Sequence, residues 1–366
     1  MTKKSLISLF LVWACSFMPP CSLAQEVMDF EKYDPVSTLV VPEHHITRAR
    51  FPFIDVHGHQ FNMNSMDLSG LITVMDTINM KVMVNLSGGS GSRLKAMKSN
   101  VDRNYPKRFM IFANIGFNGI GDPAWTEKAV RQLEDDVKNG ASGLKIFQNL
   151  GTYVSDADGK RVPVDDPRLD PIWDKCGELK VPVLIHTGAP KSFWDPVDEH
   201  NERWLELKKY PDRIRSDYSP APFQQLIDEQ HRMFRKHPGT NFIAAHLDWH
   251  GGDLVRLGSF LESMPNMYVE FGAVIAELGR QPRAAKTFFE KYQDRILFGK
   301  DSWVPAEYPT YFRVLETEDE YFPYHKKYHA YWSLYGLGLS DAVLKKIYYQ
   351  NALGLIPGID KSLFPH

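Results

Sequence analysis

The sequence Phe53-Ile54-Asp55-Val56-His57-Gly58-His59 joins a short apolar run to two histidines, and the fold of this 366-residue chain can be predicted outward from it. A nearly continuous apolar run is typical of a strand that is buried on both faces of a parallel sheet. Side chains two residues apart on a strand point to the same side, so His57 and His59 share a direction. The stretch therefore predicts a buried strand that carries a metal-binding histidine pair at its carboxyl end.

Seven further apolar runs follow, and each precedes a polar or glycine-containing turn. Helical segments lie between several of them, and strands that alternate with helices indicate βαβ units. Eight such units close into a (β/α)8 TIM barrel, whereas an open doubly wound sheet would show the same alternation. The further runs are 81–86, 109–115, 143–147, 181–185, 241–245, 267–271 and 295–299, and the expected helices are 125–138, 169–179, 222–235, 254–264 and 282–292.

Two connections are too long to be simple links between elements. Residues 189–220 follow the fifth run, and residues 303–339, which are rich in tyrosine, follow the eighth. Both leave the carboxyl ends of strands, where TIM barrels build their active sites. Long insertions there predict a lid or a substrate wall, and their rings suit an aromatic or sugar-like ligand. The alternatives are packing in the core and the contact surface of a homodimer.

The first 24 residues are predicted to form a secretory signal peptide. Two lysines precede an apolar stretch, and Ser22-Leu23-Ala24 places small residues at the cleavage positions. A membrane anchor that stays attached and a lipid-modified cysteine are the alternatives. Residues 25–50 are then a lead-in, and residues 51–366 form the barrel domain. We expect export to the bacterial periplasm or the cell exterior.

Charge and cysteine content exclude several classes of protein. Lys plus Arg number 43 against 45 for Asp plus Glu, which leaves no basic excess for a nucleic-acid backbone. No apolar run beyond the first 25 positions is long enough for a stable membrane span. Of three cysteines, only Cys176 lies outside the predicted signal, so we expect no internal disulfide. The expected partner is a small-molecule substrate.

Polar side chains that bind metals recur at the carboxyl ends of the predicted strands. His186 ends the fifth run, His246 ends the sixth and Asp301 follows the eighth. A barrel would bring these residues to the same mouth as His57 and His59. A single histidine at a strand end is as often structural as functional, but chance is a poor explanation for the whole set.

Imidazole and carboxylate ligands suit Zn²⁺ and other divalent first-row ions, of which Mn²⁺ is the second choice here. An ion with an open position lowers the pKa of a bound water and makes a nucleophile available at neutral pH. Asp301 is placed to accept and hand on the proton of that water. His246 is placed to polarise or protonate the reacting oxygen.

The chain resembles the amidohydrolase superfamily, in particular the amidohydrolase-related branch that includes aminocarboxymuconate-semialdehyde decarboxylase. The resemblance spans about residues 50 to 356 and rests on the histidine pair together with four later motifs. It implies a TIM barrel whose metal ligands are His57, His59, His186 and Asp301, with His246 as an acid-base residue. Lys300 departs from the pattern, because the family usually has a small residue before the aspartate. The later motifs are Val183-Leu184-Ile185-His186-Thr187-Gly188, Ile243-Ala244-Ala245-His246, Ile296-Leu297-Phe298-Gly299-Lys300-Asp301 and Ile347-Tyr348-Tyr349-Gln350-Asn351-Ala352.

Lys145 ends the fourth run, at the position where binuclear members of the superfamily carry a carboxylated lysine that bridges two ions. With His246 it would complete a second metal site. Lys145 would otherwise bind a substrate carboxylate or pair with an acid at the barrel mouth. Because the branch that the chain resembles mostly uses one ion, we expect one ion rather than two.

Several further residues are candidates for substrate binding. The glycine-rich segment 88–92 precedes a helix, and its N–H groups together with Arg93 would bind a substrate anion unless the segment is a plain turn. The other candidates lie beyond strand ends, where they would line the pocket. They are Trp249, His250, Glu270 and Trp303.

The leading hypothesis is hydrolysis of a C–O or C–N bond in a small ester, lactone or amide by a metal-activated water. The alternative is a carboxy-lyase that performs non-oxidative decarboxylation of an aromatic or muconate-type acid, as members of the resembling branch do with the same ligands. Export favours hydrolysis, since such decarboxylases mainly serve cytosolic catabolism. A binding protein on an inactivated barrel is a third hypothesis, although no ligand is missing.

Overall fold

The computed structural model describes residues 27–365, so the predicted signal peptide lies outside the described residues. Residues from Val41 onward form one compact unit. The described residues before it contain the short 3-10 helix Phe30–Lys32. In the described part of the chain, no helix is both long enough and apolar enough to cross a membrane.

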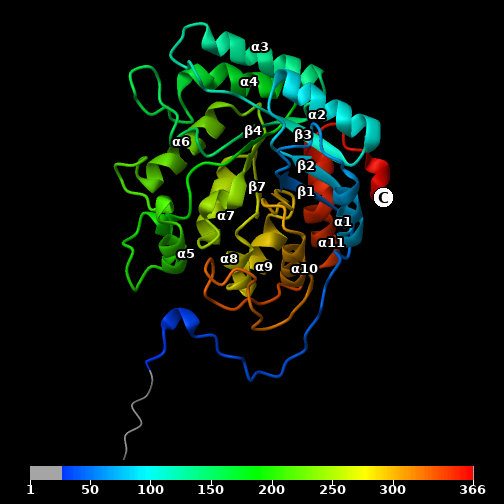
Figure 1. The fold of residues 1–366 in the computed structure, drawn as a ribbon, viewed down its shortest axis with the longest axis vertical. Helices are drawn as coiled ribbons and strands as arrows, with labels where there is room; N and C mark the ends of the chain where they lie inside the picture. Colours follow the sequence, from blue (N-terminus) through cyan, green and yellow to red (C-terminus); the bar gives the residue numbers. More distant parts are fainter. Residues whose placement is uncertain (1–26, 366) are drawn as a thin grey trace, which may run out of the picture. The chain divides into compact units, whose positions relative to one another are not determined.

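Eight parallel strands run in sequence order around the sheet, which confirms the predicted (β/α)8 barrel (Figure 1). The strand residues are buried almost throughout, as expected for strands covered on both faces. Each of the eight predicted apolar runs forms one strand. The strands are β1 (Phe53–Gly58), β2 (Met80–Asn85), β3 (Phe109–Asn114), β4 (Gly143–Ile146), β5 (Val183–Ile185), β6 (Phe242–Ala244), β7 (Met267–Glu270) and β8 (Ile296–Leu297).

Hydrogen bonds between the first and last strands close the barrel. The amide of Val56 donates to the carbonyl of Phe298 at 2.9 Å, and the amide of Asp301 donates to the carbonyl of His57 at 2.7 Å. An open doubly wound sheet would leave these two edges apart, so the alternative fold is excluded. The closure also sets Asp301 directly beside the histidine pair of β1.

The five helices predicted from the sequence all form, and their ends agree to within one or two residues. Figure 1 shows the helices around the strands. The helices are α1 (Ser69–Ile78), α2 (Gly91–Asn104), α3 (Trp125–Lys138), α4 (Asp170–Glu178), α5 (Trp204–Lys209), α6 (Phe223–Lys236), α7 (Leu254–Ser263), α8 (Ile275–Gly279), α9 (Pro282–Lys291), α10 (Tyr308–Glu316), α11 (Asp341–Lys345) and α12 (Asn351–Leu355), with a π-helical turn at Lys346–Gln350 between the last two.

The tyrosine-rich segment after β8 divides into a core part and a surface part. Its first aromatic residues belong to α10 and are fully buried, and Tyr308 and Phe312 pack on Phe53 of β1 at ring-centroid distances of 6.1 and 5.5 Å. The prediction that this whole segment forms a substrate wall is therefore wrong for α10, because its rings complete the barrel core. Tyr321 and Tyr331, further along, are largely exposed.

The insertion after β5 is joined to the segment after β8 by a buried arginine. Arg203 donates to the carbonyl of His329 and to the carboxylate of Glu277, both at 2.7 Å. It also donates to Glu206 at 3.1 Å, and its own side chain is 3% exposed. Buried charges are stable only when they are paired, so this cluster fixes the two segments against each other.

The chain leaves β6 through a left-handed turn. His246, Leu247, Asp248 and Trp249 all have positive φ angles, between 55° and 57°. Left-handed helical backbone costs L-residues about 1–2 kcal/mol each, and only glycine adopts it readily. None of these four residues is glycine, so the surrounding structure must hold the turn in place.

Candidate metal centre

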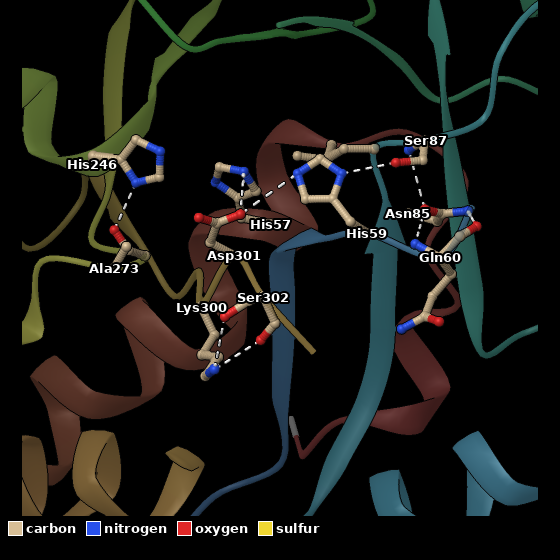
Figure 2. A network of polar contacts seen from close by, with 12 residues as sticks. His57, His59, Gln60, Asn85, Ser87, His246, Ala273, Lys300, Asp301 and Ser302 are labelled. Carbon is tan, nitrogen blue, oxygen red and sulfur yellow. Dashed lines mark hydrogen bonds and ion pairs between the residues drawn. The ribbon is translucent and has the colours of Figure 1, made fainter. Parts of the chain in front are cut away.

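Three predicted metal ligands meet where the two ends of the sheet close (Figure 2). The Nε2 atoms of His57 and His59 lie 3.5 and 3.6 Å from Oδ1 of Asp301. His57 is part of β1, His59 follows it by one residue, and Asp301 follows β8. All three offer one ligand atom within 4.8 Å of the others, as the ligands of one ion would.

The ring of His57 is fixed by Glu270 at the end of β7. Nδ1 of His57 lies 2.9 Å from Oε1 of Glu270, and both side chains are essentially buried. Because a carboxylate only accepts, Nδ1 carries the proton and the lone pair of Nε2 points to Asp301. Burial, followed by the charge of Lys145, holds the pKa of His57 well below its usual range, so the ring stays neutral at pH 7.

His59 is oriented in the same way by a residue after β2. Its Nδ1 lies 2.8 Å from the hydroxyl of Ser87, and Figure 2 shows its other nitrogen turned toward Asp301. Burial, followed by the charge of Lys145, lowers the pKa of His59 to about 4. At neutral pH the ring is therefore neutral, and the tautomer that donates from Nδ1 to Ser87 leaves Nε2 free as a metal ligand.

Asp301 stays ionised beside these two rings. Burial raises its pKa, but the neighbouring His57, His246 and His59 more than offset this, and the pKa falls below the usual value. A third of the Asp301 side chain is exposed, against 1% for His57. Asp301 therefore faces the mouth of the barrel.

The three ligand atoms present lone pairs when Nδ1 of His59 donates to the Ser87 hydroxyl, as Nδ1 of His57 donates to Glu270. Two unprotonated ring nitrogens and an ionised carboxylate repel one another at 3.5 Å unless a cation lies between them. Hydrogen bonds to the second ring nitrogens, as made here by Glu270 and Ser87, are typical of metal-ligating histidines. The site thus fits a divalent cation.

His186 and His246 lie next to this cluster. The ring of His246 is 5.1 Å from that of His57 and 4.5 Å from that of His186, measured between centroids. Nε2 of His186 is buried and has no hydrogen-bond partner among the described residues. His186 was predicted as a fourth ligand; the structure places it beside the tight three-residue cluster, with one nitrogen available.

His246 has a defined tautomer. Its Nδ1–H donates to the carbonyl of Gly272 at 2.7 Å, and its backbone amide donates to Glu270 at 2.8 Å. A carbonyl cannot donate, so Nδ1 carries a proton and Nε2 is left to exchange one. This arrangement is compatible with the acid-base role predicted for His246.

Glu270 has a different role from the one predicted. Its two oxygens accept from the ring of His57 and from the amides of His246 and Gly272, which leaves it turned away from a substrate. It also forms a second candidate metal group with His57 and His246. We assign that group to hydrogen bonding, because both Nδ1 atoms already donate. Gly299 leaves room for this carboxylate, since an added Cβ would lie 2.2 Å from Oε2 of Glu270.

Lys145 of β4 is buried, and its Nζ has no hydrogen-bond partner among the described residues. Burial lowers its pKa to about 8, while the charges of Asp301 and Glu270 act in the opposite direction. The aromatic ring of Phe147 lies 5.7 Å from Nζ. The lysine is thus a buried amine near the metal centre with no hydrogen-bond partner among the described residues; its cationic form suits carboxylate binding, whereas the bridging role requires the neutral amine, which the lowered pKa makes more accessible.

Asp55 is a supporting residue that the sequence analysis did not single out. Its Oδ1 accepts from the amides of His57 and Lys300, and its Oδ2 accepts from the hydroxyl of Tyr308 at 2.6 Å. Burial raises its pKa to about 7 in spite of these bonds. The two-residue spacing of Asp55 and His57 was the available signal, since it places both residues on the same strand face.

The unusual Lys300 does not disturb the metal centre. Its Nζ donates to the carbonyl of Ser302 at 2.7 Å and pairs with Glu307, and Figure 2 shows it directed away from the histidines. Lys300, which departs from the family pattern, is therefore accommodated by its ion pair with Glu307, just before α10.

Of the remaining substrate-binding candidates, Trp249 lies nearest to the site. Its ring is 4.6 Å from that of His246 and 5.6 Å from that of His186. Trp303 instead packs on Tyr308, 5.9 Å away. The prediction for His250 does not fit the geometry, because its ring is buried against α7 and its Nδ1 bonds the Asp248 carbonyl at 2.6 Å.

Arg93 is exposed and donates to the carbonyl of Phe61 at 2.7 Å, close to His59. Two backbone amides of the glycine-rich turn before Arg93 already donate to side chains of the protein. The amide of Gly89 donates to Asn114 and that of Gly91 donates to Asp136. These contacts favour the plain turn over an anion-binding loop.

The family model for amidohydrolases matches residues 103–357. This is more than half of the chain, so the protein belongs to the amidohydrolase family and is an enzyme of that superfamily. No curated protein sequence matches the chain.

Solved structures share the fold at low sequence identity. A dihydroxybenzoic acid decarboxylase from Polaromonas sp. JS666, with bound manganese and the inhibitor 2-nitroresorcinol, is 16% identical with a TM-score of 0.52, over 83% of this chain and 96% of that one. The 2,6-dihydroxybenzoate decarboxylase from Rhizobium is 15% identical (TM-score 0.50, 83% and 98%). The 4-oxalomesaconate hydratase from Rhodopseudomonas palustris is 14% identical (TM-score 0.50, 85% and 97%).

Replacing Glu270 with Gln should weaken metal binding without unfolding the barrel. The Glu270 carboxylate accepts three N–H groups, so the amide of Gln must set a donor against at least one of them. We expect the affinity for Zn²⁺ or Mn²⁺ to fall about 10- to 100-fold, as for other residues that orient a ligand. Isothermal titration calorimetry measures this effect. Glu290→Gln, an exposed substitution on α9, is the matched control, and equal affinities in the two variants would contradict the role of Glu270.

Proposed function

We propose that this enzyme is a metal-dependent hydrolase that cleaves a C–O or C–N bond in a small ester, lactone or amide. The observation that carries the proposal is the cluster of His57, His59 and Asp301, with its ionised carboxylate on the exposed side. Hydrolysis needs a base at the point where water and substrate enter, and Asp301 meets that need.

A divalent ion held by His57, His59 and Asp301, with His186 beside them, would activate water and polarise the scissile carbonyl. We propose Zn²⁺, with Mn²⁺ as the second choice. Asp301 accepts the proton of the attacking water on its free oxygen and passes it to the leaving group. In its protonated form, His246 donates from Nε2 to the developing oxyanion. Both residues are positioned before substrate arrives, because the amide of Asp301 donates to the His57 carbonyl and Nδ1 of His246 donates to the Gly272 carbonyl.

Aromatic side chains flank the proposed substrate position. Phe61 and Phe147 lie 5.8 and 5.7 Å from the ring of His59, and Trp249 packs on His246. Phe61 is more than half exposed, so its ring is available to a ligand. Planar or aromatic acyl groups would stack between these walls.

The alternative function is non-oxidative decarboxylation of an aromatic or muconate-type acid. The observation that favours it is Lys145, whose buried Nζ has no hydrogen-bond partner within residues 27–365 and could hold a carboxylate. Two solved structures with this fold are dihydroxybenzoate decarboxylases, although at 15–16% identity they support the fold alone. We rank hydrolysis first because of the predicted export.

An assay with paired substrates separates the two reactions. We expect hydrolysis of p-nitrophenyl acetate and dihydrocoumarin, and no release of carbon dioxide from 2,6-dihydroxybenzoate or other hydroxybenzoates. Asp301→Asn should lower kcat about 100- to 10,000-fold, the usual contribution of a general base. Asp294→Asn, an exposed substitution just before β8, is the matched control. Carbon dioxide release without ester hydrolysis would establish the carboxy-lyase instead.

We propose one ion for each chain and an unmodified Lys145. Three ligand atoms converge on one point, and the second candidate group is accounted for by hydrogen bonds. Metal analysis by plasma mass spectrometry should give one ion for each chain, and the intact mass should show no added carbon dioxide. Two ions together with a carboxylated lysine would replace this proposal with the binuclear site.

We also propose that the chain is exported and cut after Ala24. The support comes from the residue pattern alone, with lysines, an apolar stretch and Ser22-Leu23-Ala24 in order. Expression of the full chain in a Gram-negative host, followed by amino-terminal sequencing of the periplasmic fraction, should read from Gln25. An intact amino terminus in the membrane fraction would favour the retained anchor.

A further inference from the structure

The left-handed turn after β6 presents different side chains to opposite sides. His246 and Trp249 are three residues apart, so in a turn of three residues they lie on the same face. Their rings contact each other at 4.6 Å and both pack on the ring of His186. Asp248, between them, is buried against α6. One strained segment thus connects the candidate acid-base residue to a helix outside the metal centre.

The connection to α6 is made by the Asp248 carboxylate. Its Oδ1 accepts from Nε2 of Gln230 at 2.6 Å, and its Oδ2 accepts from Nε2 of His231 at 2.7 Å. All three side chains are at most 2% exposed. Burial alone would raise the pKa of Asp248, but the partner histidines lower it to about 2, so the group is a buried anion.

Apart from Asp248, few side chains anchor the turn. Trp249 donates from its indole N–H to the carbonyl of Thr187 at 2.8 Å. Nδ1 of His250 lies 2.6 Å from the Asp248 carbonyl and 3.3 Å from Oδ2 of Asp248, so this carboxylate has one local partner besides the two on α6. His246 is held by hydrogen bonds to Glu270 and Gly272. Left-handed backbone is unfavourable for L-residues, so the turn would relax if nothing held it. The hydrogen bonds between Asp248 and α6 oppose that relaxation.

We propose that Asp248, clamped by His231 and Gln230 of α6, is a positioning residue that holds the strained turn and thereby sets His246 and Trp249 against the metal centre. Its effect on catalysis rests on the proposed function, whereas its effect on the turn does not. Without the clamp, the backbone relaxes and the ring of His246 loses its bond to Gly272.

The test compares two substitutions of His231 with one control substitution at the C-cap of the same helix. His231→Leu removes the N–H group that donates to Asp248. His231→Gln instead provides a side-chain amide that can donate to Asp248 from a similar distance. His237→Leu is the control, because His237 is also buried, ends α6 and pairs with Asp170 and Asp174 away from the turn. Both leucine variants should lower the thermal midpoint, so stability alone does not distinguish them.

Crystal structures provide the readout that does not depend on activity. We expect His231→Leu to move residues 246–249 out of the positive-φ region and to separate the His246 ring from the Gly272 carbonyl. His231→Gln and His237→Leu should keep the wild-type turn. An unchanged turn in His231→Leu would overturn the proposal. Asp248→Asn, which sets an amide against a donor of α6, is a second variant in case His231→Leu does not fold.

Kinetics with p-nitrophenyl acetate provide the second readout. We expect kcat of His231→Leu to fall about 100-fold with KM little changed, as for other small misplacements of a reacting group, and His231→Gln to recover most of it. Equal kcat values in His231→Leu and His237→Leu would reduce Asp248 to a structural residue. If the wild-type protein does not hydrolyse this ester, the proposed function fails, and the crystal structures still decide whether Asp248 holds the turn.

Discussion

One buried carboxylate, that of Glu270, holds together parts of the site that come from different strands. It accepts from a side chain of β1, from the amide that follows β6, and from an amide just beyond its own strand. A buried anion that receives three N–H groups is satisfied only when all three elements are in place. The tautomer of His57 and the start of the left-handed turn both follow from it. Gly299 is required at its position because this carboxylate occupies the space that a side chain would need.

The metal centre could serve more than one reaction, and its ligands are held in fixed orientations by their neighbours. Its ligands are unprotonated at neutral pH because burial disfavours the charged form of the rings, and the ionised Asp301 gains from the same neighbours. Membership of the amidohydrolase family agrees with this donor set. Hydrolysis and decarboxylation need the same ligands, so they differ in what lies around the ion, and here that is Lys145 and the aromatic walls. The protein's choice between the two reactions therefore depends on the mouth of the barrel.

The fold and the ligand cluster could be predicted from sequence because both follow from regular spacing. Eight apolar runs gave eight strands, and residues at their carboxyl ends met as barrel closure requires. The role of Glu270 could not be predicted, because a carboxylate at a strand end looks the same whether it faces a substrate or a histidine. The aromatic residues of α10 were misassigned for a similar reason, because the composition of a segment does not show which of its tyrosines are buried and which are exposed. The turn at 246–249 carries no glycine, so nothing in the sequence signalled its handedness.

The arginine that joins the two insertions also affects how a ligand enters and leaves. Arg203 is paired with Glu206 and Glu277 in the interior, and separating such charges without solvent is unfavourable. The walls on that side of the mouth are therefore preformed in the free enzyme rather than closed over a bound ligand. A rigid entrance discriminates by shape at the encounter stage, and turnover there does not wait for a loop to reopen.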